Sequence, residues 1–104
     1  MAAEVEDVDV RRHVMATQYS IHRLRLQLQR NEVLLQSLQY ELSGLVAHRN
    51  HCLAVLYRSG GQASRYRAEL QRTERKILSV QNRIECVTLS CRQVQRRLAT
   101  GYSY

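Results

Sequence analysis

The chain lacks proline, tryptophan and phenylalanine, and it has only four glycines among 104 residues. A compact globule of this length normally fills its core with large aromatic side chains and folds around it through several turns. Strands are not expected, because the apolar residues recur at intervals of three and four rather than two. The length allows one domain, residues 1–104. These absences predict an all-α chain built from long helices.

Other absences narrow the class of protein. No apolar run approaches the length of a membrane span, and the acidic start lacks the features of a secretory or mitochondrial presequence. Three cysteines form no recognisable disulfide framework, which predicts reduced thiols. We therefore expect a cytoplasmic protein, associated with the cytoskeleton in one interpretation, with the nucleus as the alternative.

Charge is unevenly distributed along the chain, which has a net charge of +7. Residues 1–9 contain four acidic residues and no basic one, and an acidic start suits the positive end of a helix dipole. Residues 10–58 contain seven arginines against two glutamates, and residues 65–104 contain nine basic residues against three glutamates. The basic remainder favours acidic partners, namely nucleic acid, anionic lipid or an acidic protein surface.

A heptad repeat runs through the whole chain. With position a set at Val14, 21 of the 26 a and d positions are apolar, counting Cys, Ala and Tyr. This pattern, sustained over so many heptads, is typical of a coiled coil. Two ordinary amphipathic helices of a bundle are the alternative.

The segment RSGGQAS, residues 58–64, decides between a hairpin and one continuous helix. The heptad phase passes through it unbroken, and two glycines inside a helix cost only about 1 kcal/mol each relative to alanine. However, glycine is also the usual residue just past a helix end, and Ser64 is suited to cap a second helix. We predict an antiparallel coiled-coil hairpin, with helices over about 8–58 and 64–100 and a turn at 59–63. The longer helix then measures roughly 75 Å.

Closing the hairpin near Gly61 sets a register. It pairs Cys52 with Leu70 and Leu24 with Leu98, and it brings the polar seam residues into shared layers. Arg49 then lies opposite Thr73, and Asn31 lies opposite Cys91. Polar residues at such positions commonly fix register at some cost in stability.

A second row of apolar residues lies opposite the seam on the first helix. Six consecutive heptad f positions are apolar: Tyr19, Leu26, Val33, Tyr40, Ala47 and Ala54. We call these six residues the outer stripe. Near the bend, Val46 and Leu53 make the helix apolar almost all round. A helix that is apolar on opposite faces is normally packed between two other elements, so these positions predict a partner interface.

Residues suited to catalysis or to metal binding are sparse. His48, His51 and Cys52 lie within about one helical turn, but Cys52 belongs to the seam while the histidines point elsewhere, and no second ligand pair follows. The chain contains no Gly-rich phosphate loop and no grouping of nucleophile and base. We expect no enzyme activity, no metal and no cofactor.

The second helix carries a basic surface, represented by Arg65, Arg72, Arg75, Lys76, Arg92 and Arg96. The sequence thus favours a coiled-coil scaffolding subunit of a larger cytoplasmic assembly, cytoskeletal, ciliary or vesicle-tethering. Its partners would be other helical subunits, in a hetero-complex or a homo-oligomer, or an acidic protein surface. The alternative is a basic hairpin that binds nucleic acid through these residues.

Overall fold

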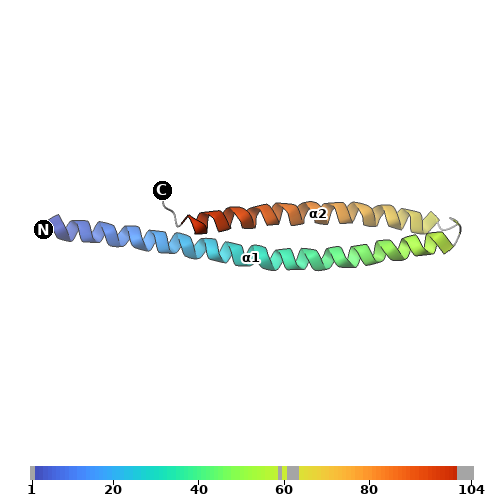
Figure 1. Ribbon diagram of the computed structural model, residues 1–104, viewed down its shortest axis with the longest axis horizontal. Helices are drawn as coiled ribbons and strands as arrows, with labels where there is room; N and C mark the ends of the chain where they lie inside the picture. The colour runs from blue at the N-terminus through green and yellow to red at the C-terminus, as the bar shows by residue number, and fades with distance from the viewer. Residues whose placement is uncertain (1, 59, 61–63, 101–104) are drawn as a thin grey trace.

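The computed structural model describes residues 2–58, 60 and 64–100, with side chains described from Val10 onward. Within these ranges it consists of two long helices and no strand: α1 spans Ala2–Arg58 and α2 spans Ser64–Ala99 (Figure 1). The predicted all-α hairpin fold is therefore confirmed. The molecule is a narrow rod whose principal extents are 88 × 18 × 16 Å.

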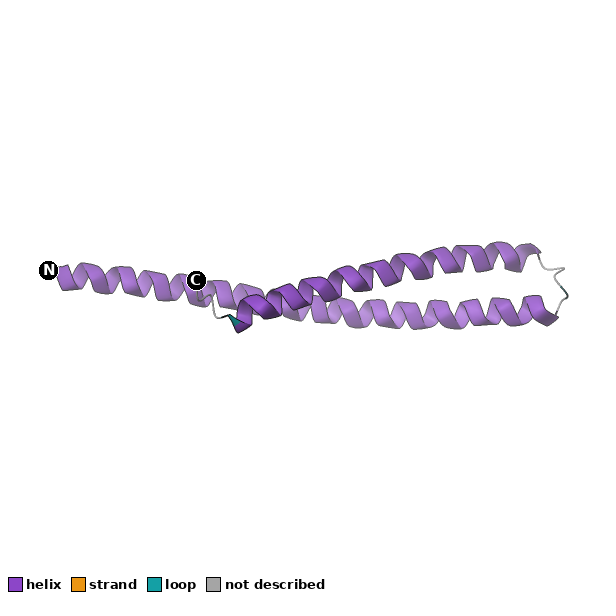
Figure 2. Cartoon of the chain, turned by 45° about the horizontal axis from the view of Figure 1, so that its top comes forward, coloured by secondary structure: helices purple, strands orange, loops and turns teal. Residues whose placement is uncertain are grey.

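Specific contacts establish that α2 runs back along α1. The Asn31 side-chain amide donates to the Ser90 hydroxyl at 2.9 Å, and the His48 ring nitrogen lies 3.1 Å from a Glu69 carboxylate oxygen. Residues early in α1 thus contact residues late in α2. Figure 2 shows α2 crossing over α1 toward its C-terminal end, as expected of helices that wrap around a shared seam.

The seam follows the heptad closely. Among the described side chains, all the buried residues occupy a or d positions: Leu24, Leu38, Cys52, Thr73, Ile77, Val80, Cys91 and Val94. The remaining seam positions from Thr17 to Leu98 are half-buried where they are described. A single seam two residues wide thus forms the entire core, and its burial provides most of the stability of the hairpin.

The predicted turn at 59–63 includes residues 59 and 61–63, which lie outside the described part of the chain. Gly60 is described, and its φ of 63° places it in the left-handed region. Glycine adopts this conformation readily, and it commonly does so just after a helix ends. The glycine therefore suits the chain reversal that follows Arg58.

The first helix starts earlier than the sequence predicted. It begins at Ala2 rather than near residue 8, so the acidic segment lies within α1. Acidic side chains near a helix N-terminus are favourable with the helix dipole, which explains why the helix continues through them. At 1.5 Å per residue a helix of 57 residues measures about 85 Å, consistent with the long axis of the molecule.

A distance between two labels can test the hairpin in solution. Gln36 and Cys86 are both exposed, and the predicted register places them side by side across the two helices. Spin labels on Gln36→Cys and on the natural Cys86 should be separated by less than about 30 Å, since packed helix axes lie roughly 10 Å apart. In one continuous helix the same labels would be about 75 Å apart. Dilution with unlabelled protein removes the contribution of label pairs that lie on different molecules.

Candidate protein interface

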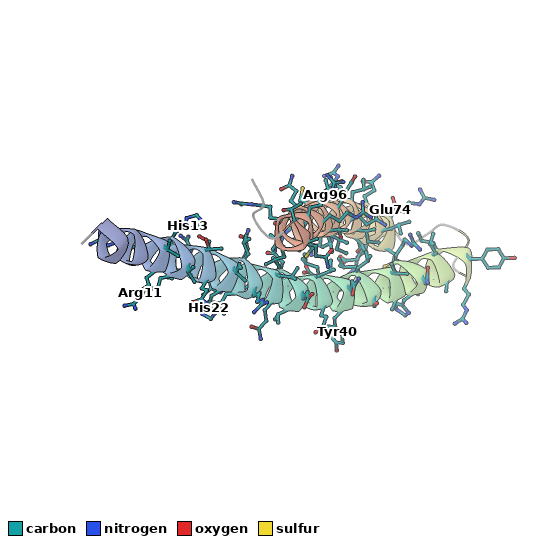
Figure 3. All side chains as sticks on the ribbon, turned by 60° about the vertical axis from the view of Figure 1, so that its left-hand side comes forward. Arg11, His13, His22, Tyr40, Glu74 and Arg96 are labelled. Carbon is teal, nitrogen blue, oxygen red and sulfur yellow. The ribbon has the colours of Figure 1, made fainter. Side chains whose placement is uncertain are left out.

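The outer stripe lies on the surface of α1 that faces away from α2. Tyr19, Val33 and Tyr40 are 64%, 62% and 85% exposed, and Leu26 is 38% exposed. Ala47 and Ala54 continue the row and are also exposed. Figure 3 shows Tyr40 projecting from α1 on the side opposite α2. Within the described hairpin, the Arg23 guanidinium lies over the Tyr19 ring at 6.0 Å from its centroid, and Val33 and Tyr40 face solvent.

Val46 and Leu53, the two interface candidates near the bend, belong to a different face. Both occupy heptad position e, beside the seam rather than opposite it. Val46 is half-buried, while Leu53 remains 45% exposed. These two residues therefore form an edge of the seam, and they are separate from the outer stripe.

The polar seam residues lie within the contact between the helices, and they differ in burial and in hydrogen bonding. Thr73 is buried, and its hydroxyl donates to the Glu69 carbonyl one turn earlier at 2.8 Å. Asn31 is half-buried and bonds Ser90, the residue that precedes its predicted layer partner Cys91. Arg49 is half-buried, and its Nε is buried with no hydrogen-bond partner among the described residues. Arg49 is thus the least satisfied polar group of the seam.

A polar cluster flanks the seam beside Arg49. Glu69 accepts from Arg72 at 2.7 Å and lies against His48, whose Nε2 is also 3.7 Å from the Cys52 sulfur. The hydrogen bond from Arg72, followed by that from His48, holds the pKa of Glu69 below its ordinary value. His48 adjoins the predicted layer of Arg49 and Thr73, and Glu69 adjoins the next layer, of Cys52 and Leu70, so their contact is compatible with the predicted register. The sequence reasoning did not anticipate this cluster.

Replacing Arg49 and Thr73 together by leucine should stabilise the hairpin. The change removes a buried donor without a partner, whose desolvation costs about 1–3 kcal/mol, and it adds apolar surface to the seam. Polar seam positions also select register and oligomeric state, so the variant should form additional assemblies. Thermal unfolding followed by circular dichroism, together with light scattering after gel filtration, measures both effects. Unchanged stability and an unchanged assembly state would contradict a shared buried layer.

The basic surface residues predicted on α2, Arg65, Arg72, Arg75, Lys76, Arg92 and Arg96, are all exposed. Glu69 neutralises Arg72 in part, and Figure 3 shows both Glu74 and Arg96 on the outer side of α2. Near the bend, acidic and basic residues are interspersed. The surface of α2 near the bend therefore does not have an electrostatic potential of a single sign.

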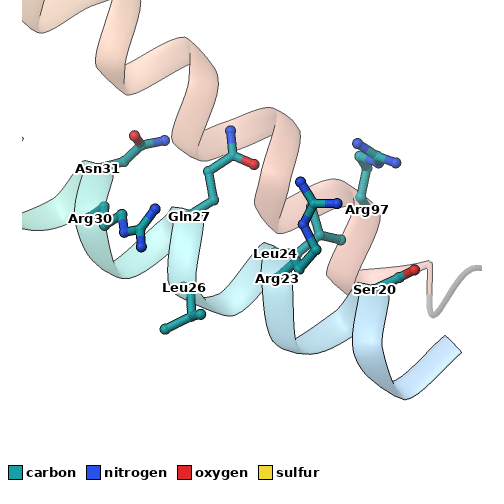
Figure 4. Close-up of a pocket in the computed structure, with 8 residues that line it drawn as sticks. All are labelled: Ser20, Arg23, Leu24, Leu26, Gln27, Arg30, Asn31 and Arg97. Atoms are coloured by element: carbon teal, nitrogen blue, oxygen red, sulfur yellow. The ribbon is translucent and has the colours of Figure 1, made fainter. Parts of the chain in front are cut away.

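The opposite, open end of the hairpin is different. The segments 10–31 and 86–99 together contain eight arginines and no aspartate or glutamate. An open pocket of about 610 Å³ lies along one side of α1, lined there by Arg23 and Arg30 among others and by Arg97 of α2 (Figure 4). In this close-up Leu26 points away from α2. The sequence alone could have revealed this basic end if the acidic residues had been counted over segments 10–31 and 86–99 instead of over whole helices.

Sites for metal ions or nucleophilic chemistry do not emerge within the described ranges. No group of three or more metal-ligating side chains gathers there. Cys52 and Cys91 are buried in the seam and Cys86 is exposed, and all three are free thiols. Neither helix, over its described residues, has a stretch long and apolar enough to cross a bilayer.

Comparisons with known proteins add no relative. The chain matches no family model, no curated protein and no solved structure. The arrangement of its own surfaces is therefore the basis for any functional conclusion.

Proposed function

We propose that this chain is a non-enzymatic structural subunit that binds another helical protein along the outer stripe and so joins it to a larger assembly. The exposed row from Tyr19 to Tyr40 is the observation that carries the proposal. Single exposed apolar residues are common on soluble proteins, but four of them aligned at heptad spacing on one helix face indicate a binding surface. Side chains spaced seven apart fit the face of another helix.

The shape of the hairpin supports the same role. A single seam between two helices buries little area for its length, and small scaffolds of this kind usually gain stability from a partner. Free thiols at Cys52, Cys86 and Cys91 suit a reducing compartment, so the proposed assembly is cytoplasmic. A cytoskeletal, ciliary or vesicle-tethering complex would use a rod of this type as a spacer or bridge.

Photo-crosslinking at matched tyrosines tests the proposal. A benzophenone amino acid placed at Tyr40 or at Tyr57 reports what lies against each position; the two residues are 85% and 90% exposed. Tyr40 belongs to the outer stripe, whereas Tyr57 occupies heptad position b. In extracts of the native source, Tyr40 should form a discrete crosslinked product and Tyr57 should not. Equal yields from both positions would refute the outer stripe as the interface.

Nucleic-acid binding is the second candidate, favoured by the basic open end. The eight arginines within segments 10–31 and 86–99, which contain no acid themselves, would neutralise several phosphates. Phosphate binding weakens steeply as salt rises, whereas an apolar interface does not. Retention of the native partner through a wash at high salt, with no binding to a DNA or RNA duplex, favours the scaffold. Salt-sensitive duplex binding lost in Arg92→Glu with Arg96→Glu favours the alternative.

A further inference from the structure

The first helix extends several turns beyond the end of α2, and its seam residues continue there without a partner (Figure 1). Val10 and Val14 hold d and a positions, but they are 60% and 45% exposed, while Leu24, the first buried seam residue, is 6% exposed. We call residues 2–21 the overhang. A seam pattern that continues past the end of its partner helix indicates that something else covers it.

The distribution of charge along α1 indicates which partner fits the overhang. The overhang begins with an acidic segment, residues 2–9, and the basic open end starts directly after it at residue 10. Arg11 and Arg12 adjoin the acids on the same helix, whereas Arg25 is 21 residues from Glu4, which corresponds to about 32 Å. Glu4 and Arg25 cannot meet within one molecule. A second copy, approaching in the opposite direction, brings each acidic segment to the basic end of the other copy.

We propose that two copies of this chain pair through their overhangs in antiparallel orientation, with Val10 of each copy packed against Val14 of the other. The arrangement has twofold symmetry, so each contact occurs twice. The same register places Asp7 in a layer with Thr17 and Ala3 in a layer with Ile21. At a flanking position it brings Glu4 opposite Arg25, which is a pair of complementary charge.

Space at the end of α2 selects this register. The predicted register places Leu98 opposite Leu24 in the hairpin, so a second copy that follows the same track along α1 must stop about one turn earlier. The proposed register ends at Ile21 and fills the overhang. A shift of one heptad toward the bend would drive the incoming helix into α2. A shift in the other direction would place Asp7 against Val10 and lose the layer of paired valines.

Shape gives the first measurement. A dimer joined only by its overhangs is long, because two rods of 88 Å that overlap by about 30 Å span roughly 145 Å. Small-angle scattering should show the maximum dimension rising from near the monomer value toward this length as concentration increases. Side-by-side association along the outer stripe would leave the length close to that of one rod, and it would overturn the proposal. So would a chain that remains monomeric at its solubility limit.

Variants locate the contact. Val10→Glu and Val14→Glu should each weaken dimerisation about tenfold or more, since each removes a buried apolar side chain. Val33→Glu, on the outer stripe, should leave the dimer intact. Sedimentation equilibrium measures the dissociation constants, and circular dichroism verifies that the helices persist. If Val33→Glu dissociates the dimer and the two overhang variants do not, the overhang is not the interface.

Orientation has its own test. Glu4→Arg and Arg25→Glu should each weaken the dimer, and the double variant should recover it. In a Cys86→Ser background, mixed Val10→Cys and Val14→Cys proteins should form a disulfide more readily than either protein alone. Preferential crosslinking of Val10→Cys to itself would show parallel pairing and contradict the register. None of these outcomes depends on the proposed partner of the outer stripe.

Discussion

Replacing Leu26 and Val33 by glutamate is expected to abolish binding of the partner protein while the helical hairpin remains folded. Both side chains lie on the outer stripe, and neither contributes to the buried seam. Burying an apolar side chain of this size contributes roughly 1.5–3 kcal/mol, so losing two should weaken the complex about 100-fold or more. Co-purification from the native source measures the binding, and circular dichroism reports the helices.

A matched variant on the second helix controls for added charge. Leu78 and Leu89 are 61% and 50% exposed on α2 and lie outside the outer stripe. Leu78→Glu with Leu89→Glu should leave partner binding intact, as should charge reversal at Arg75 and Lys76. If the stripe variant still binds and the charge-reversed protein does not, electrostatic attraction rather than the stripe holds the partner.

Truncating Leu38 to alanine should largely unfold the hairpin. Leu38 is 2% exposed at the middle of the seam, and replacing a fully buried leucine by alanine typically costs about 2–5 kcal/mol. A two-helix fold has a small core, so a loss of this size is a large fraction of its total stability. Thermal and urea unfolding monitored by circular dichroism should show a much lower midpoint.

Leu34 provides the comparison for this prediction, since it is the same residue type one turn away. It is 40% exposed, and alanine has the higher helix propensity, so Leu34→Ala should change stability by less than about 1 kcal/mol. Equal losses from the two substitutions would mean that burial in the seam is not what stabilises the fold. A partner that covers Leu34 would be revealed by destabilisation of the complex alone.

Much of the fold was predictable from the sequence because the a and d positions of the heptad are the positions that become buried. Leu24, Leu38 and Val94, for example, are buried where the pattern places them, and the exposed outer stripe appears in the same pattern as the f positions. Side-chain spacing along a helix is fixed by its geometry, so a face can be assigned before its partner is known.

Other features depend on distances that spacing alone does not supply. The contact between His48 and Glu69 requires the register across two helices, and the unpaired Nε of Arg49 requires the position of every neighbouring acceptor. The start of α1 at Ala2 was missed because the acidic segment, residues 1–9, was treated as separate from the helix that follows it. There the interaction of the acids with the helix dipole favours continuation.

The single seam also determines how the molecule responds to tension. Seam layers lie one after another from Leu24 to the bend, and the C-terminal end of α2 is beside α1 at the open end (Figure 1). Force that pulls the C-terminal end of α2 away from the part of α1 beside it separates the helices sideways and opens one layer at a time. Force along the rod, applied between the overhang and the end of α2, loads all the layers together in shear. A subunit of this shape therefore resists sliding far better than peeling, and the direction in which its attachments pull decides whether it holds or opens.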